Sequence, residues 1–268
     1  MDIVVLMKQI PDTEAPVEIA ESGHCLNEED LKWAINPYDE YALEEALLIK
    51  ESRDDVTVTV VTVGPDRVSE AIRVAYAMGV DNAIHINDEI DEEVYGAVDA
   101  YTTSTILAKA IKELPCDMII AGTRAVDDDN YMVPACVSKM LGVPMISNVA
   151  KQDIDGSTIT CEQAIDGGVA VLKAELPILM TAAKGINEPR YPAFRAIMKA
   201  KKKKVDEKEL DDLGFDAEAE LGRAGAKVRI RSMAYPEARA AGKMIDGGSP
   251  AEKAAELVRL LKEEACVI

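Results

Sequence analysis

The sequence predicts a doubly wound α/β protein: a mostly parallel sheet with helices on both faces, an antiparallel hairpin and an extended C-terminal arm. Three observations predict this fold class. Up to about residue 150, short apolar runs alternate with amphipathic segments of helical length, and the connections are short. Residues 151–175 alternate polar and apolar side chains between Gly-containing turns. Beyond residue 190 neither pattern continues.

The first three elements have recognisable start and stop signals. Residues 3–7 are a continuous apolar run, which is typical of a strand buried in a parallel sheet. Residues 37–51 predict a helix, because an Asn suited to the N-cap precedes a Pro at the first helical position. Residues 56–63 alternate Val and Thr and predict a strand, which a Gly-Pro pair ends.

The same alternation continues to residue 149. Gly79 and Gly142 each follow an amphipathic segment and mark the end of a helix. The further predicted elements are helices at residues 66–78, 98–113 and 130–141 and strands at residues 83–86, 117–121 and 145–149. Parallel strands joined by helical crossovers place helices on both faces of the sheet.

The second part of the chain predicts a different organisation. Residues 151–164 and 168–175 are expected to be antiparallel strands, and residues 177–181 a strand that returns to the main sheet. Residues 184–226 are expected to be irregular, followed by a short strand at 227–231 and a helix at 249–264. We therefore expect an α/β nucleotide-binding domain at 1–190 and, at 191–268, a partner-recognition loop with a C-terminal arm.

Composition excludes several classes of function. The chain has 268 residues, with 49 acidic and 30 basic side chains and a net charge of −19, which argues against binding nucleic acid or an anionic membrane surface. No apolar run approaches the roughly 20 residues of a membrane span, and the N-terminus lacks a basic region and a cleavage site. Five cysteines without a CxxC spacing favour a reducing, cytoplasmic location.

No catalytic apparatus is evident in the sequence. Only two histidines occur, and neither lies in a nucleophile or metal-binding motif. The sequence also lacks GxxxxGK[ST] and, after the first strand, GxGxxG, so the usual phosphate-binding loops are absent. We predict neither a catalytic residue nor a metal site.

Three loops are the candidate ligand site, because ligands of doubly wound sheets bind beyond the carboxyl ends of the strands. The loops are residues 8–12, the turn at 63–65 and residues 122–129. The third runs into a predicted helix N-terminus, where free N–H groups attract phosphate. It also carries Asp127, Asp128 and Asp129, which would repel phosphate if all faced it. A solvated acidic turn therefore stays open as an alternative.

The segment NEPRYPAFRAIMKAKKKK at 187–204 is the second candidate functional feature. Two prolines stiffen its backbone, and Phe194 stands beside Arg195 and ahead of Ile197 and Met198. A rigid loop that carries an aromatic side chain, an Arg and a Met is typical of an interface anchor. The Lys run after it is either a solvated face or a contact with an acidic partner.

Seven segments, in order along the chain, resemble the β-subunit family of electron transfer flavoproteins. They are VLMKQIPDT (5–13), NPYDEYALEEA (36–46), VTVGP (61–65), AIRVAYAMGVDNAIHI (71–86), AGTRAVDDDN (121–130), IDGG (165–168) and the 187–204 segment. The resemblance implies an adenine nucleotide alpha hydrolase-like fold and a heterodimer with a larger α subunit that holds most of a shared, redox-active FAD. The C-terminal arm within residues 191–268 is expected to pack on this α subunit. The resemblance also implies AMP, or a second FAD in electron-bifurcating members, bound in this chain.

The resemblance assigns residues to both candidate sites. It implies a nucleotide site formed by Leu6, Lys8, Asn36, Tyr38, Asp39, Val63, Gly64, Gly122, Asp127, Asp129 and Asn130, with the backbone N–H groups of Tyr131, Met132 and Val133. It implies that Pro192, Phe194, Arg195, Ile197 and Met198 dock acyl-CoA dehydrogenase-type flavoenzymes, with Phe194 as the anchor.

Two departures from the family pattern leave the nucleotide open. Met132, Val133 and Pro134 occupy places where family members often have Gln, a small residue and Gly, and Ala164 stands where the mitochondrial type has an acidic residue. DAYTTS at 99–104 nearly matches the DTxATS motif of bifurcating members. Those members, however, tend to have DGD where this chain has Asp127, Asp128 and Asp129. We therefore expect an electron-carrying small subunit, with a bifurcating subunit or a stand-alone adenine-nucleotide sensor as the alternatives.

Overall fold

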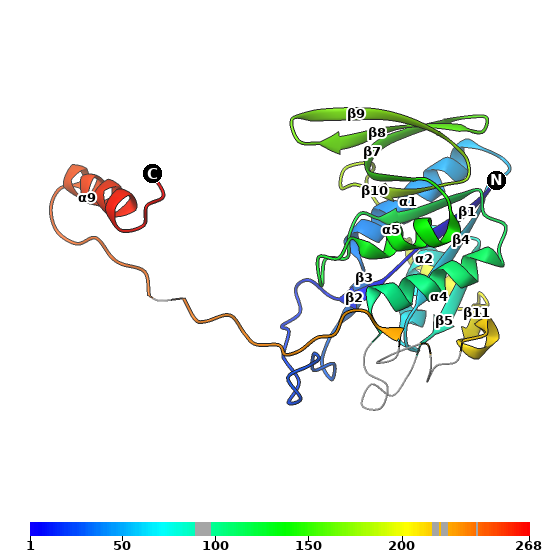
Figure 1. Cartoon of the computed structure of the whole chain (residues 1–268), viewed down its shortest axis with the longest axis horizontal. Helices are drawn as coiled ribbons and strands as arrows, with labels where there is room; N and C mark the ends of the chain where they lie inside the picture. The colour runs from blue at the N-terminus through cyan, green and yellow to red at the C-terminus, as the bar shows by residue number, and fades with distance from the viewer. Residues whose placement is uncertain (89–97, 216–219, 221–224, 240) are drawn as a thin grey trace. The chain divides into compact units, whose positions relative to one another are not determined.

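The computed structural model describes residues 1–88, 98–215, 220, 225–239 and 241–268, and it confirms the α/β fold (Figure 1). Nine strands form one sheet in the order β11-β5-β4-β1-β6-β10-β7-β8-β9. The strands are β1 (Asp2–Leu6), β4 (Thr57–Val63), β5 (Asn82–Asn87), β6 (Met118–Gly122), β7 (Met145–Asp155), β8 (Thr158–Ile165), β9 (Gly168–Glu175), β10 (Ile178–Ala182) and β11 (Asp206–Glu209).

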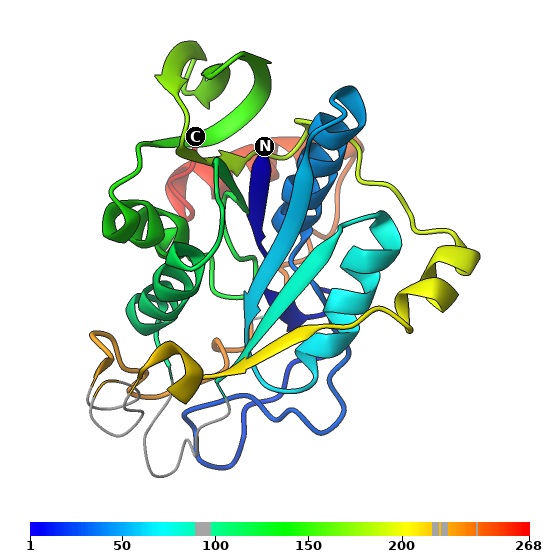
Figure 2. The same ribbon diagram turned by 90° about the vertical axis from the view of Figure 1, so that its right-hand side faces the viewer.

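Helices cover both faces of the sheet (Figure 2). The helices of the body are α1 (Pro37–Ser52), α2 (Val68–Met78), α4 (Ala100–Lys112), α5 (Met132–Leu141) and α6 (Phe194–Ala200). On β1, Ile3 and Val5 belong to the core that α1 and α2 cover, whereas Val4 and Leu6 belong to the core under α4 and α5. Both faces of β1 are buried, so its apolar run is continuous rather than alternating.

The chain changes direction across the sheet between β1 and β6. β1 pairs in parallel with β4 on one side and with β6 on the other. The chain passes from β1 to β4 and β5, then returns through α4 to β6 on the opposite side of β1. The carboxyl ends of β1, β4 and β6 therefore meet at a switch point, which is where doubly wound sheets bind ligands.

The antiparallel part of the sheet differs in detail from the prediction. Residues 145–155 form one long strand, β7, whose first half pairs in parallel with β10 and whose second half pairs antiparallel with β8. β10 does return to the main sheet, between β6 and β7. A small second sheet of β2 (Gln9–Pro11) and β3 (Trp33–Ile35), where no regular element was predicted, lies between β1 and α1 along the chain.

Residues 191–215 carry more regular structure than predicted. α6 packs on α2, and β11 adds a parallel strand beside β5, followed by the short helix η1 (Asp211–Leu213). The strand predicted at 227–231 is wrong, because these residues pair with no strand in the described part of the chain.

The chain divides into two compact units, residues 1–231 and 232–268. The second contains helix α9 (Pro250–Glu263), which begins at a capping box formed by Ser249 and Glu252. Among the described residues, no helix is both long and apolar enough to cross a bilayer.

Candidate functional site

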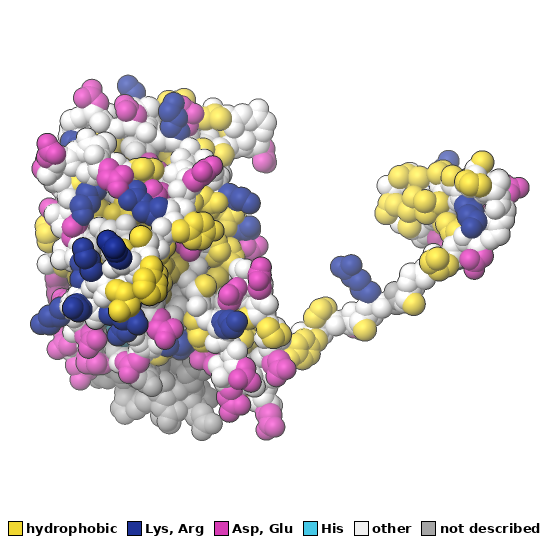
Figure 3. Space-filling model, turned by 180° about the vertical axis from the view of Figure 1, so that it is seen from behind, with side chains coloured by type: hydrophobic (Ala, Val, Ile, Leu, Met, Phe, Trp, Pro, Cys, Tyr) yellow, Lys and Arg dark blue, Asp and Glu magenta, His cyan; other side chains and the backbone are white. Residues whose placement is uncertain are grey.

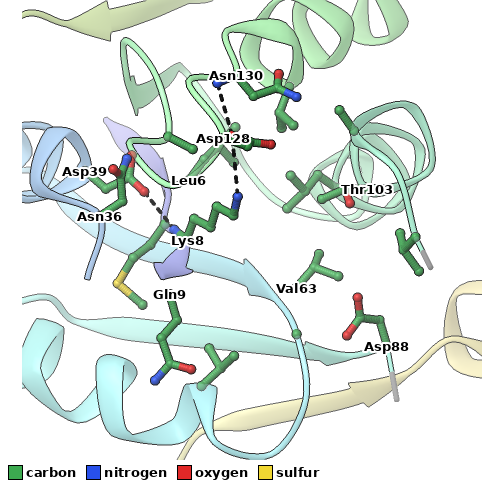
Figure 4. Close-up of a pocket in the computed structure, with 18 of the residues that line it drawn as sticks. Leu6, Lys8, Gln9, Asn36, Asp39, Val63, Asp88, Thr103, Asp128 and Asn130 are labelled. Atoms are coloured by element: carbon green, nitrogen blue, oxygen red, sulfur yellow. Dashed lines mark hydrogen bonds and ion pairs between the residues drawn. The ribbon is translucent and has the colours of Figure 1, made fainter. Parts of the chain in front are cut away.

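A cavity of about 630 Å³ opens at the switch point (Figure 4). Its volume lies within the roughly 300–1,000 Å³ that small-molecule sites occupy. The ends of β1, β4 and β6, the N-terminus of α1 and the first turn of α4 all contribute to its wall. The predicted site residues that line it are Leu6, Lys8, Asn36, Asp39, Val63, Gly64, Gly122, Asn130 and Val133.

Each carboxylate of the Asp triplet has a partner of its own. Asp127 Oδ2 lies 2.8 Å from Lys8 Nζ, and Asp129 Oδ1 lies 2.8 Å from Arg124 Nη1. Asp128 Oδ1 accepts a hydrogen bond from the backbone N–H of Asn130 at 3.1 Å. Since each carboxylate has a cation or a hydrogen-bond donor beside it, the triplet does not present three free negative charges to a phosphate.

Asp39, which lines the cavity, is hydrogen-bonded to the ends of two strands, β1 and β6. Its Oδ2 accepts from the backbone N–H of Lys8 at 2.7 Å, and its Oδ1 accepts from that of Gly122 at 3.0 Å. Burial raises the pKa of Asp39 to about 7, although hydrogen bonds from Lys8, Asn36 and Gly122 act in the opposite direction. A Cβ on Gly122 would collide with Asp39 Oδ1 and lie 2.7 Å from the carbonyl carbon of Tyr38, so only Gly fits there.

Asn36 fixes the loop that follows β6. Its Nδ2 donates to the carbonyl of Arg124 at 2.9 Å, and its Oδ1 accepts from the N–H of Val126 at 3.2 Å. Its own N–H donates to the carbonyl of Lys8 at 2.9 Å. Asn36 is buried, so it holds three segments of the cavity wall in register.

Gly64 forms the turn after β4. Its φ is +157°, and a Cβ would lie 2.5 Å from Val68 Cγ2. The buried His85 on β5 contacts the carbonyl of Gly64 through Nε2 at 2.7 Å. His85 therefore contacts the turn that forms this part of the cavity wall.

Five predicted residues do not line the cavity: Tyr38, Asp127, Asp129, Tyr131 and Met132. Arg124 sits between the rings of Tyr38 and Tyr131, at 5.2 and 6.0 Å from their centroids, and donates to Tyr131 Oη at 3.2 Å. Asp129 reaches the same Arg124. The N–H of Met132, predicted to face phosphate, instead donates to Asn130 Oδ1 at 2.7 Å.

The first turn of α4 forms another wall, which only the DAYTTS motif had indicated. Thr102 Oγ1 donates to Asp99 Oδ1 at 2.8 Å, and Ser104 Oγ donates to the carbonyl of Ala100 at 2.5 Å. Both hydroxyls are therefore used within the helix. Thr103 lines the cavity and points into it (Figure 4).

The sequence analysis did not identify Arg67, which lines the cavity. Its guanidinium stacks on Trp33 at 3.8 Å from the ring centroid, and its Nη2 lies 3.3 Å from Glu28 Oε1. No motif marks it, because Trp33 and Glu28 come from a stretch that the sequence does not assign to any element.

The cavity contains polar atoms that a ligand can satisfy. Gln9 Oε1, Arg67 Nε and Arg124 Nε are buried and, among the described residues, have no hydrogen-bond partner. All three residues line the cavity. Buried polar groups normally have partners, so these atoms fit a bound polar molecule, such as one that carries phosphate, hydroxyl and ring-nitrogen groups.

The predicted docking residues lie away from the cavity, around α6. We name residues 191–198 the docking segment. Tyr191 is 98% exposed and Phe194 76%, and Met198 is also exposed. On this side of the molecule, apolar side chains lie beside a group of Lys and Arg side chains (Figure 3). The structure thus presents an apolar centre with a basic border, as interfaces commonly do.

Together, these features define a doubly wound α/β protein with a cavity at its switch point. Comparison with known proteins identifies the family: the model of the electron transfer flavoprotein domain matches residues 24–213. The chain belongs to the electron transfer flavoprotein family.

Three relatives illustrate how far the similarity extends. The chain is 41% identical over the whole of both sequences to an electron transfer flavoprotein subunit beta of Bacillus subtilis. It is 37% identical to the subunit beta of Clostridium acetobutylicum, over 98% of this chain and 99% of that one. It is 33% identical to that of Megasphaera elsdenii, over 90% of each. The C-terminal arm is thus included in the first two matches.

Proposed function

We propose that this chain is the small, beta-type subunit of a heterodimeric electron transfer flavoprotein. It binds an adenine nucleotide at the switch point, completes with an α subunit the site of a shared FAD, and carries electrons between dehydrogenases and a downstream acceptor. The observation that carries the proposal is the cavity. It brings most of the residues expected to hold the nucleotide to one place, in a chain whose relatives are named beta subunits.

The chain's residues have binding roles in this proposal. FAD supplies the redox chemistry when bound, and the protein supplies position and electrostatics. Lys8 and the first turns of α4 and α5 offer a cation and helix N-termini to phosphate groups, while Val63 and Leu6 offer apolar surface to the base. All five cysteines are free thiols, which suits the cytoplasmic location that we propose.

AMP is the nucleotide that we place in the cavity, and a second FAD is the alternative. One observation favours the alternative: Thr103 adds a hydroxyl to the same cavity from the DAYTTS segment. A bifurcating subunit would use this hydroxyl for a pyrophosphate.

Nucleotide analysis of the purified complex tests the proposal. The chain is co-expressed with its α-type partner, the complex is denatured, and the released FAD and AMP are quantified. One FAD and one AMP per complex support the simple carrier, and two FAD support the bifurcating alternative. A colourless chain that forms a stable homodimer and retains nucleotide would instead support a stand-alone sensor and contradict the proposal.

Docking of acyl-CoA dehydrogenase-type flavoenzymes is assigned to the docking segment. An aromatic side chain as exposed as Phe194 is expected to enter an apolar pocket of the partner. Phe194→Ala should leave the flavin content unchanged and raise the KM for the complex in a dehydrogenase assay roughly tenfold, the loss expected for a modest hot spot. Unchanged kinetics would place the docking surface elsewhere.

A further inference from the structure

Arg190 directly precedes the docking segment and is held by helix α1. Its Nε donates to Glu44 Oε2 at 2.8 Å and its Nη2 donates to Oε1 at 2.8 Å, a two-pronged pairing that fixes the plane of the guanidinium. Its Nη1 donates to Glu51 Oε1 at 2.6 Å, and its backbone N–H donates to Glu44 Oε2 at 3.1 Å. Both the side chain and the backbone of Arg190 are therefore attached to the same helix.

The two glutamates differ in exposure. The Glu44 side chain is 5% exposed and the Glu51 side chain 57%. They are seven residues apart and lie on one face of α1. The hydrogen bond from Arg190 lowers the pKa of Glu51, which remains in contact with water. Without Arg190, the Glu44 carboxylate would be buried without a cation, which is unfavourable.

A second attachment lies three residues earlier. Asn187 Nδ2 donates to the carbonyl of Tyr41 at 3.0 Å and to Glu45 Oε2 at 2.8 Å. Glu45 Oε1 accepts from Gln152 Nε2 on β7 at 2.9 Å. Consecutive glutamates on α1 thus hold Asn187 and Arg190, so the chain is fixed as it enters the docking segment.

The far end of the docking segment is also fixed. Ala200 is buried against the core that α1 and α2 cover, and Tyr76 Oη on α2 donates to the carbonyl of Lys204 at 2.8 Å. Between these attachments, Tyr191 and Phe194 project into solvent. A side chain ordered before it meets its partner binds more tightly, because less conformational entropy is lost on docking.

We propose that Arg190, through Glu44 and Glu51, is a positioning residue that holds the docking segment in the conformation in which Phe194 enters the partner flavoenzyme. This inference rests on the proposed function, which supplies the partner. Arg190 acts through the backbone that it holds and does not itself occupy the partner's pocket.

The first test measures the order of the segment without any dehydrogenase. In the complete complex, trypsin cleavage after Arg195 and Lys199 is followed by mass spectrometry. Arg190→Gln is expected to speed this cleavage about tenfold, because cleavage follows the population of locally open chain. Lys151→Gln, which removes an exposed ion pair with Glu162, should leave the rate unchanged. An unchanged rate in Arg190→Gln would overturn the inference.

The second test is a double-mutant cycle in the dehydrogenase assay. Arg190→Gln should raise the KM for the complex about tenfold with kcat unchanged, and it should add nothing in a Phe194→Ala background, because it acts through Phe194. Arg190→Lys keeps the charge but loses the two-pronged geometry, so it should raise KM by less than Arg190→Gln does. It replaces Arg190→Gln in this test if that variant does not assemble into the complex.

The outcomes separate this inference from the proposed function. If Phe194→Ala alone leaves KM unchanged, the proposed docking fails and this inference fails with it. If Phe194→Ala raises KM but Arg190→Gln does not, or if the two effects multiply in the double variant, only the positioning role of Arg190 is overturned.

Discussion

The buried Asp39 carboxyl is expected to make the stability of the folded chain depend on pH. Burial raises its pKa to about 7 from an ordinary value of 3.8, against the opposing hydrogen bonds from Lys8, Asn36 and Gly122. The folded chain therefore keeps this proton up to about pH 7, whereas the unfolded chain releases it near pH 4. Because the folded state binds more protons in that window, the contribution of Asp39 to stability is present below pH 4 and is lost as the pH rises to 7.

Asp39→Asn is expected to remove this pH dependence. Between pH 5 and pH 8, the free energy of unfolding of the parent chain should fall by about 2–3 kcal/mol relative to that of the variant. Urea unfolding of both proteins at the two pH values measures the difference. Parallel pH profiles would mean that Asp39 does not titrate in this range.

Gly122 makes the close approach between β6 and α1 possible. Gly122→Ala should destabilise the chain by roughly 1–3 kcal/mol and reduce bound nucleotide, because the new Cβ forces Asp39 and the backbone of Tyr38 out of place. Gly168→Ala is the matched control, since a Cβ there meets nothing within 4 Å. The melting temperature and the nucleotide content of both variants are measured. Equal values for Gly122→Ala and Gly168→Ala would contradict the close-packing role of Gly122.

At this scale, the sequence predicted which loops meet but not how their side chains pair. The order of Asp127, Asp128 and Asp129 cannot tell which one reaches a cation, because that depends on where Lys8 and Arg124 lie in space. The predicted repulsion of phosphate is thereby relieved in a way that sequence alone does not indicate.

Among the elements, the strands at the centre of the sheet were predicted and the strand at its charged edge was not. β1 and β6 were predicted because their side chains are largely apolar and buried, and β4 because it alternates Val and Thr. β11 was missed because its residues, DEKE, are all charged and lie at the edge of the sheet, where backbone pairing alone defines a strand. The strand at 227–231 was predicted from its alternation, yet the described chain offers it no neighbour.

The change of partner along β7 depends on Asn148. Its φ is +52°, its N–H donates to Thr181 Oγ1 at 2.9 Å, and its Nδ2 donates to the carbonyl of Ala164 at 2.9 Å. The pairing of β7 with β10 shifts register at this point, which explains why the sequence suggested two separate strands. Left-handed backbone is tolerated by Asn and Gly but not by β-branched residues.

Asn148→Val should therefore destabilise the body by about 1–3 kcal/mol. Asn148→Gly is the control, since it loses the same side-chain hydrogen bond but adopts the positive φ easily. The midpoints of urea unfolding of the two variants measure the strain separately from the hydrogen bond. A larger loss in Asn148→Gly than in Asn148→Val would contradict this account of the bend.

In the whole molecule, nearly all of the described buried core belongs to the first compact unit, and the C-terminal unit holds little of it. The buried apolar residues of the described chain lie before residue 216, except for Leu260 on α9. Leu257 and Val258 on α9 are exposed. Isolated helices of this length are marginal in water, even with a good N-cap. We therefore propose that the apolar side chains of α9 pack on the α-type subunit.

Removal of residues 232–268 tests this separation. The chain 1–231 should keep its melting temperature within about 3 °C, because it retains nearly all of the described core, and it should keep its nucleotide, because every residue that lines the cavity is present. Its association with the α-type subunit should weaken at least tenfold, since the apolar face of α9 is lost. Thermal unfolding, nucleotide release and titration with the α-type subunit measure the three quantities. Undiminished association would show that the arm does not contribute to the heterodimer, whereas loss of nucleotide would show that the body depends on the arm.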